Sequence, residues 1–250
     1  MKRRHLFAAN WKMHKTVAQA EQYIRQLEDN LRPEIAADIF IAPSFTALYP
    51  LSHLFSSGPC VFGAQNISDQ VEGALTGEIS VNMVAEAGAK FVILGHSERR
   101  RLFCEDNDSI QRKIMLALQN KLEVLLCIGE TAEERSTGKT FHLIDEQLRN
   151  CLKGVSDLEL RQVSIAYEPV WAIGSGLAAS PRDAQDVHAF IRKWCEKNWG
   201  SSQEALRILY GGSVNSKNAA NFLNEEDIDG LLIGTASLDP NTFSEIVNLG

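Results

Sequence analysis

Short, continuously hydrophobic runs recur along the chain and alternate with longer stretches of helical periodicity. In the first such stretch, Val17, Ala20, Ile24, Leu27 and Leu31 fall on one helical face. Strands that are buried on both faces of a parallel sheet read as unbroken apolar runs. The runs predicted to be strands are Leu6–Ala9, Ile39–Ala42, Cys60–Ala64, Phe91–Leu94, Val124–Ile128, Val163–Tyr167, Leu206–Tyr210 and Ile228–Ile233.

Helix boundaries are also readable at a few positions. Ser180-Pro181-Arg182-Asp183 combines an N-cap serine, a proline at the first helical position and an acid at the third. Gly154 and Gly200 each follow a helical stretch, as glycines that end helices do. These signals place helices between the predicted strands.

Eight strands that alternate with helices over 250 residues predict an α/β fold, a single-domain (β/α)₈ barrel over residues 1–250. No Pro/Gly/Ser-rich or low-complexity stretch divides the chain. The alternative is a doubly wound open sheet, which normally carries a Gly-x-Gly-x-x-Gly turn after its first strand. Here Asn10-Trp11-Lys12-Met13 follows that strand instead, so the barrel is favoured.

Charge narrows the possible ligands. The formal net charge is −7 and the pI is about 5.4, which argues against a nucleic-acid or anionic-membrane surface. No stretch reaches the ~18 apolar residues that a transmembrane helix needs. An anionic ligand would have to be held locally, by a well-placed lysine or by backbone N–H groups at glycine turns and helix starts.

The five cysteines are far apart in the sequence and form no Cys-x-x-Cys pair. Neither a zinc site nor a disulfide framework is indicated, so no metal is expected. A reducing, cytoplasmic location fits this cysteine usage best. The cysteines are Cys60, Cys104, Cys127, Cys151 and Cys195.

Polar residues and glycines follow the predicted strands at the end where barrel enzymes carry their active sites. Glu168 stands out, because it lies between an apolar strand and Pro169, which restricts it to extended backbone angles. A salt-bridged structural glutamate is the alternative interpretation. The residues at the strand ends are Asn10, Lys12, His96, Glu168, Gly211-Gly212-Ser213 and Gly234.

Seven segments, ordered along nearly the whole chain, carry a family resemblance. They are Ala9–Met13, Gly63–Asn66, Leu75–Glu78, Leu94–Arg100, Cys127–Glu130, Ala166–Gly174 and Tyr210–Val214. Together they closely resemble the triosephosphate isomerase family. The resemblance implies interconversion of dihydroxyacetone phosphate and D-glyceraldehyde 3-phosphate through an enediolate, a step of glycolysis and gluconeogenesis, with a small phosphorylated triose as substrate and no cofactor.

The resemblance also assigns catalytic roles. Glu168 would be the base, and its apolar neighbours would disfavour its charged form and strengthen it as a base. His96 would polarise the substrate carbonyl, and the helix start at Ser97 would favour its neutral form. Lys12 would stabilise the developing negative charge, with Asn10 as a hydrogen-bond donor nearby. Glu98, Glu130 and Arg100 are expected to be supporting or packing charges.

The phosphate would be held mainly by backbone amides of Gly174, Ser213 and Gly234. Thr235 stands where the family usually has a second glycine, so it fits only if it keeps ordinary backbone angles. A lid would cover the site, and its second hinge departs from the family's usual Lys-Thr-Ala. The lid residues are Pro169, Val170, Trp171, Ala172, Ile173, Gly174, Ser175, Gly176, Leu177, Ala178 and Ala179.

The segment Gln65 to Glu78 is long for a connection between a strand and a helix. By resemblance it projects into a second copy of the chain, where Thr76 would approach the partner's Asn10 and Lys12. A homodimer is therefore expected, with Gln65, Thr76 and Glu78 at the contact.

Two other functions remain open from the residues alone. Another phosphate-binding barrel isomerase or an aldolase is one, although an aldolase needs a buried Schiff-base lysine and none lies in an apolar run between Phe91 and Tyr210. A catalytically inactive barrel with a binding role is the other. Such a protein should have lost Lys12, His96 or Glu168, and all three are present.

Overall fold

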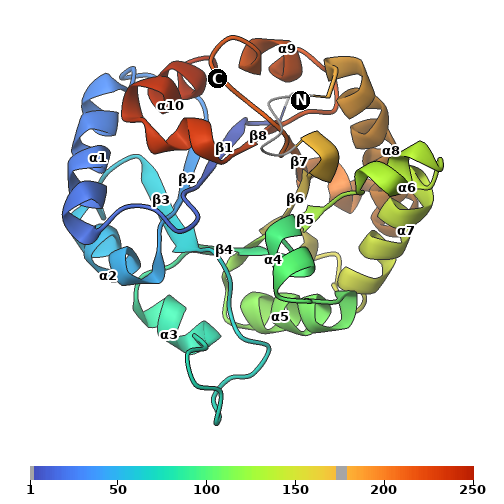
Figure 1. Cartoon of the computed structure of the whole chain (residues 1–250), viewed down its shortest axis with the longest axis horizontal. Helices are drawn as coiled ribbons and strands as arrows, with labels where there is room; N and C mark the ends of the chain where they lie inside the picture. The colour runs from blue at the N-terminus through green and yellow to red at the C-terminus, as the bar shows by residue number, and fades with distance from the viewer. Residues whose placement is uncertain (1–2, 173–178) are drawn as a thin grey trace.

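The computed structural model describes residues 3–172 and 179–250, which form a closed barrel of parallel strands (Figure 1). The strands follow one another in chain order, and β1 pairs with both β2 and β8. The predicted barrel is confirmed, and the open sheet is excluded because the sheet has no edge. The strands are β1 Leu6–Asn10, β2 Asp38–Ala42, β3 Cys60–Ala64, β4 Phe91–Leu94, β5 Glu123–Ile128, β6 Val163–Tyr167, β7 Arg207–Tyr210 and β8 Gly230–Ile233.

Helices surround the strands and cover the outside of the barrel (Figure 1). The predicted start of α8 is confirmed, because the Ser180 side chain accepts the N–H of Asp183 and Pro181 is the first helical residue. The α-helices are α1 Val17–Asn30, α2 Phe45–Leu54, α3 Val81–Glu86, α4 Ser97–Leu102, α5 Asn107–Gln119, α6 Ala132–Ser136, α7 Thr140–Cys151, α8 Pro181–Trp199, α9 Ala219–Leu223 and α10 Pro240–Val247; the 3₁₀ helices are η1 Glu159–Gln162, η2 Val170–Ala172, η3 Gly200–Ala205 and η4 Thr235–Leu238.

The interior of the barrel is a packed hydrophobic core. Phe40 and Phe91 stack there with ring centroids 4.4 Å apart. A larger apolar layer lies between the strands and the surrounding helices. Side chains therefore fill the barrel, and a ligand can enter only at one of its two ends.

Charged residues at the amino-terminal ends of the strands neutralise one another. Arg207 contacts Asp38 at 2.5 Å and Glu123 at 3.5 Å, and Arg4 contacts Asp38 at 2.8 Å. These residues begin or precede β1, β2, β5 and β7. This end of the barrel is closed by ion pairs, which leaves the carboxyl-terminal end for chemistry.

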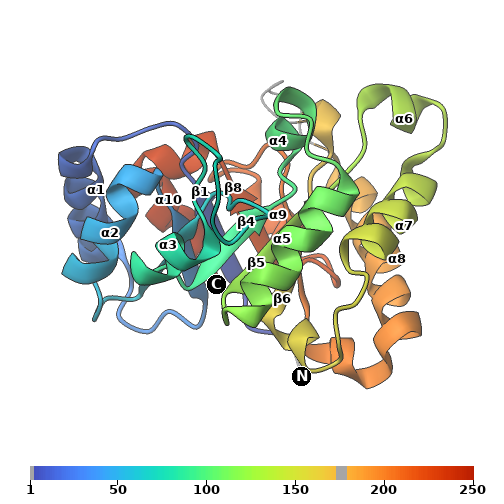
Figure 2. The same cartoon turned by 90° about the horizontal axis from the view of Figure 1, so that it is seen from below.

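The connection between β3 and α3 projects from the outer ring (Figure 1). Residues 71–78 are all exposed, and Val71 and Leu75 are its exposed large apolar side chains. At the carboxyl-terminal end of the barrel, α4 and α6 lie on the same side of the molecule (Figure 2). Among the helices in the described ranges, none is both long enough and apolar enough to cross a bilayer.

Candidate active site

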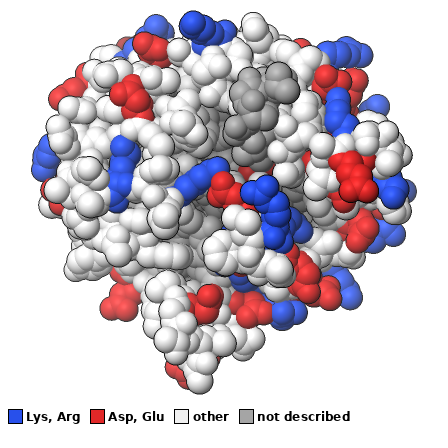
Figure 3. Space-filling model, in the orientation of Figure 1, with Lys and Arg blue, Asp and Glu red and all other residues white. Residues whose placement is uncertain are grey.

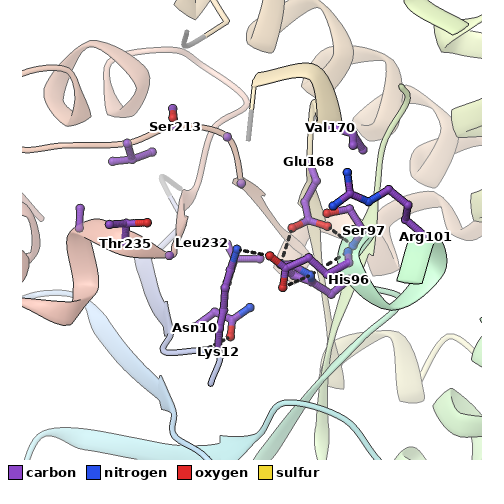
Figure 4. A pocket seen from close by; sticks show the side chains of 16 residues that line it. Asn10, Lys12, His96, Ser97, Arg101, Glu168, Val170, Ser213, Leu232 and Thr235 are labelled. Carbon is purple, nitrogen blue, oxygen red and sulfur yellow. Dashed lines mark hydrogen bonds and ion pairs between the residues drawn. The ribbon is translucent and has the colours of Figure 1, made fainter. Parts of the chain in front are cut away.

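A cavity of about 330 Å³ opens at the carboxyl-terminal ends of the strands (Figure 4). Asn10 and Lys12 enter it from the end of β1, His96 from the end of β4 and Glu168 from the end of β6. The turn after β7 and the start of η4 form its opposite wall. The structure thus brings together, in one cavity, residues that lie far apart in the sequence.

Glu168 is 2 % exposed and makes two close contacts through its carboxylate. One oxygen lies 3.0 Å from His96 Nε2, and the other accepts the backbone N–H of Ser97 at 2.8 Å. Burial by itself raises the pKa of Glu168, but His96, the Ser97 N–H and Lys12 together outweigh burial and lower it. Burial therefore disfavours the charged form as expected, but it does not set the net direction of the pKa shift.

Two glycines make room for Glu168. A Cβ on Gly129, just after β5, would lie 1.7 Å from the carbonyl oxygen of Glu168, so only glycine fits there. A Cβ on Gly211, just after β7, would lie 3.0 Å from Glu168 Cγ. The chain just after β5 and just after β7 therefore packs directly against Glu168, and this packing restricts where its backbone can lie.

His96 is the N-cap of α4, and its Nδ1 accepts the backbone N–H of Glu98 at 3.2 Å. With Nδ1 as an acceptor, the neutral ring carries its hydrogen on Nε2 and donates it to Glu168. Burial lowers the pKa of His96, but the adjacent Glu168 carboxylate raises it to a greater extent. The paired carboxylate therefore opposes the neutral form that the helix start is expected to favour.

Lys12 is held in an unusual backbone conformation, with φ of 52°. The Asn10 side chain accepts the N–H of Lys12 at 3.1 Å, and Gln65 donates to the Lys12 carbonyl at 2.8 Å. Lys12 Nζ lies 2.6 Å from Glu98 Oε1. Acidic and basic side chains meet at the centre of this face of the molecule (Figure 3). Lys12 and Glu98 both line the cavity.

The residues predicted to hold phosphate lie across the cavity from Glu168 and His96. Ser213 and Thr235 line that wall together with Gly234 (Figure 4). Thr235 begins η4 and is not among the described non-glycine residues with positive φ. It therefore meets the condition of ordinary backbone angles. Gly174, the remaining candidate, lies outside the described residues.

The described part of the predicted lid is anchored at both of its ends. Trp171 Nε1 donates to Glu130 Oε1 at 3.0 Å, and the same oxygen accepts the Tyr167 hydroxyl at 2.9 Å. At the far end, the Ala179 N–H donates to the Tyr210 hydroxyl at 3.2 Å. Ile173, Gly174, Ser175, Gly176, Leu177 and Ala178 lie outside the described residues.

Sequence reasoning missed several contributors. Glu98, expected to be a supporting charge, is the direct ion-pair partner of Lys12. The Ser97 N–H binds the Glu168 carboxylate, and Arg101 and Leu232 line the cavity. In the sequence, the only indication of these roles is that the residues lie near the ends of predicted strands. Within the described ranges, no cluster of three or more His, Cys, Asp or Glu residues could hold a metal ion.

The triosephosphate isomerase family model matches residues 5–250. A triosephosphate isomerase of Aquifex aeolicus is 46% identical over 244 residues, which are 98% of each chain. One of Protochlamydia amoebophila is 48% identical over 246 residues, which are 98% of this chain and 93% of the relative. The chain belongs to the triosephosphate isomerase family, and it catalyses that family's interconversion of dihydroxyacetone phosphate and D-glyceraldehyde 3-phosphate.

Proposed function

We propose that Glu168 is the base that takes the proton from C1 of dihydroxyacetone phosphate and returns it to C2 of the enediolate. A single observation carries this assignment: Glu168, His96 and Lys12 face one cavity, and Glu168 is the buried carboxylate among its lining residues. Its contacts to His96 and Ser97 favour the ionised form that a base requires.

His96 acts beside the base. Its Nε2 carries the hydrogen of the neutral ring and points at Glu168. When substrate enters, the same N–H is placed to donate to the carbonyl oxygen and to move protons between the two substrate oxygens. Neutral imidazole suits this role, because the Nδ1 position is already occupied by the Glu98 N–H.

Lys12 provides the cation for the substrate phosphate and for the enediolate oxygen. The Glu98 carboxylate forms an ion pair with its ammonium group at 2.6 Å. When the dianionic substrate binds, it either shares the Lys12 ammonium group with Glu98 or displaces the Glu98 carboxylate from it. Asn10 contributes by fixing the Lys12 backbone through its side-chain oxygen, and its amide N–H group is left to face the ligand.

The phosphate group occupies the opposite wall, at Ser213, Gly234 and Thr235. Small residues let the backbone approach an anion there, and Gly234 and Thr235, at the start of η4, both line the cavity. The segment from Pro169 to Ala179 is proposed as the lid over this end, with Gly174 as a further phosphate contact. Trp171 and Ala179 are its anchored ends.

Solvent hydrogen exchange at C1 of dihydroxyacetone phosphate tests the role of Glu168 directly. Glu168→Asp withdraws the carboxylate by about an ångström and is expected to slow exchange by ~10²-fold or more. Glu133→Asp, an identical change at an exposed position, serves as the control. If the Glu168→Asp protein exchanges as fast as the parent, Glu168 is not the base.

We further propose that the protein is a homodimer formed through residues 65–78. This segment projects from the barrel (Figure 1), and the side chain of Thr76 is exposed. Exposed Met13, Phe45 and Tyr49 supply further apolar surface. Gln65 is used within its own chain, where it donates to the carbonyls of Lys12 and Ala42, so Thr76 and Glu78 are left to contact the partner.

We also propose a cytoplasmic location. All five cysteines are free thiols, as a reducing compartment maintains, and four of them are buried.

A further inference from the structure

A second cavity, the rear cavity, lies against the substrate cavity but farther from the barrel axis. It has a volume of about 280 Å³, is open to solvent on one side, and is lined by residues of α4, of the connection from β5 to α6, and of α7. Leu143 and Gln147 of the outer helix α7 form its far wall. Ser97, Arg101, Glu168 and Val170 line both cavities, so the proposed base separates one from the other.

The basic side chains of the rear cavity lack acidic partners. The half-buried Arg100 donates only to neutral acceptors: the carbonyls of Gly95 and Cys127, the Asn107 side chain at 2.6 Å and the Cys151 sulfur. Arg101 forms no hydrogen bond or ion pair with any described residue. Figure 4 shows it beside Ser97 and Val170, on the side away from Ser213 and Thr235. The donors of Arg100 are therefore already occupied, and the exposed Arg101 is the guanidinium of this lining that remains available to a ligand.

The acidic side chains of the same cavity are already engaged. Glu134 accepts the N–H and the hydroxyl of Thr131, at 2.7 and 2.8 Å, in the capping box of α6. Glu168 is bound by His96 and Ser97. The balance of available groups in this cavity therefore favours a negatively charged ligand.

The remaining lining sets the size and shape of such a ligand. Ile128, Leu143 and Val170 provide apolar surface, and the Ser97 hydroxyl makes no hydrogen bond with any described residue. Ligand sites typically combine apolar walls with a few polar anchors. The volume is close to that of the substrate cavity, so a molecule of similar size fits. A small carboxylate with an apolar body matches both features.

We propose that the rear cavity is a regulatory binding site for a small apolar carboxylate, which Arg101 holds and which fixes Glu168 against the Ser97 N–H. A ligand in the rear cavity contacts Glu168 from the side opposite the substrate cavity. It slows proton abstraction while the substrate cavity stays open. This mode of action rests on the proposed role of Glu168, whereas occupancy of the cavity does not.

Benzoate is a suitable probe, because it pairs a carboxylate with a flat apolar ring. Binding is measured by isothermal titration and by ligand-observed NMR, with inorganic phosphate present to fill the substrate site. Turnover is measured at saturating substrate. The expected result is millimolar binding that survives in phosphate, together with a fall in kcat that additional substrate does not reverse.

Two variants locate the probe. Leu143→Trp fills the rear cavity from the half-buried outer helix, and Arg101→Gln removes the anchoring charge. Each is expected to weaken benzoate binding at least tenfold. Leu158→Trp and Arg161→Gln make the same changes at exposed positions outside both cavities and should bind benzoate like the parent. Circular dichroism shows whether each variant is folded.

Three results would overturn the proposal: no benzoate binding at tens of millimolar, unchanged binding in both cavity variants, or displacement by phosphate with purely competitive inhibition. Binding in the rear cavity with unaffected turnover would remove the regulatory action. The exchange experiment on Glu168→Asp remains separate, because the titration reports occupancy whether or not Glu168 is the base.

Discussion

The Glu168 carboxylate lies 3.0 Å from His96 Nε2, so the proposed base and the proposed electrophile are hydrogen-bonded to each other. Each residue supports one ionisation state of the other: the carboxylate raises the pKa of His96, and the ring lowers the pKa of Glu168. The pH dependence of the reaction therefore reports on this pair.

His96→Gln is expected to move the acidic limb of the kcat/KM profile to higher pH. Burial raises the pKa of Glu168, and His96 is the largest of the influences that lower it, so its loss raises that pKa. The wild-type pairing contributes stability above the unfolded carboxylate's pKa, and this contribution is lost as pH falls through the folded value. The profile is measured from pH 4 to 9, with His142→Gln as the exposed control. An unshifted acidic limb would count against the pairing.

Lys12→Met is expected to lower kcat/KM by ~10²- to 10³-fold, because a preorganised positive group in the cavity is lost. The control is Lys15→Met, which removes the same charge three positions later. Lys15 lies over the rings of Trp11 and Tyr23 and does not line the cavity. Steady-state kinetics separates the two variants, and equal losses in both would show that only overall charge matters.

Trp171→Phe removes the indole N–H that donates to the fully buried Glu130. We expect kcat to fall several-fold, because an anchor of the proposed lid is lost and a buried carboxylate loses one of its donors. Trp194→Phe removes a comparable indole hydrogen bond, to Asp145 on the outer helices. That control should change thermal stability alone. A kcat loss of equal size in both variants would contradict the lid assignment.

Thr235→Gly is expected to leave turnover within about tenfold of the parent, a difference of ~1.4 kcal/mol. The reason is that Thr235 already has ordinary backbone angles, so glycine adds freedom without relieving strain. Kinetics with glyceraldehyde 3-phosphate measures the change. A loss of several orders of magnitude would mean that the threonine side chain itself holds the phosphate.

Thr76→Arg is expected to shift the protein toward monomer in sedimentation and to lower activity with it, since a long charged side chain would enter the proposed contact. The control Ser136→Arg changes an exposed residue at the end of α6 in the same way. A parent protein that sediments as a fully active monomer would end the dimer proposal.

The fold could be predicted because each strand is buried on both faces and therefore leaves an unbroken apolar run. All eight strands lie within two residues of their predicted bounds at either end. The largest difference between a predicted and an observed strand boundary is at β8, which begins at Gly230 rather than Ile228. Asp229, just before it, accepts from Arg192 and from the Ile208 N–H, and these side-chain contacts have no signature in a hydrophobic pattern.

The position of the candidate site could be predicted because strand ends converge in a barrel. The ion pairs and the pKa shifts of the site could not be predicted in this way. Lys12 and Glu98 are 86 positions apart, and their contact depends on the neighbouring ends of different strands. The lowered pKa of Glu168 has the same origin, because its partners Ser97 and His96 come from another strand. The rear cavity lies between helices and leaves no local pattern either.

The two glycines beside Glu168 restrict how this scaffold can be adapted to other substrates. Gly129 has no space for even a methyl group, and Gly211 has almost none. Enlarging or reshaping the cavity therefore has to proceed from other lining residues, such as Val214 and Ala236, two described residues that form no hydrogen bond or ion pair with Glu168. Any engineered relative that accepts a bulkier sugar phosphate should accumulate its changes among those residues.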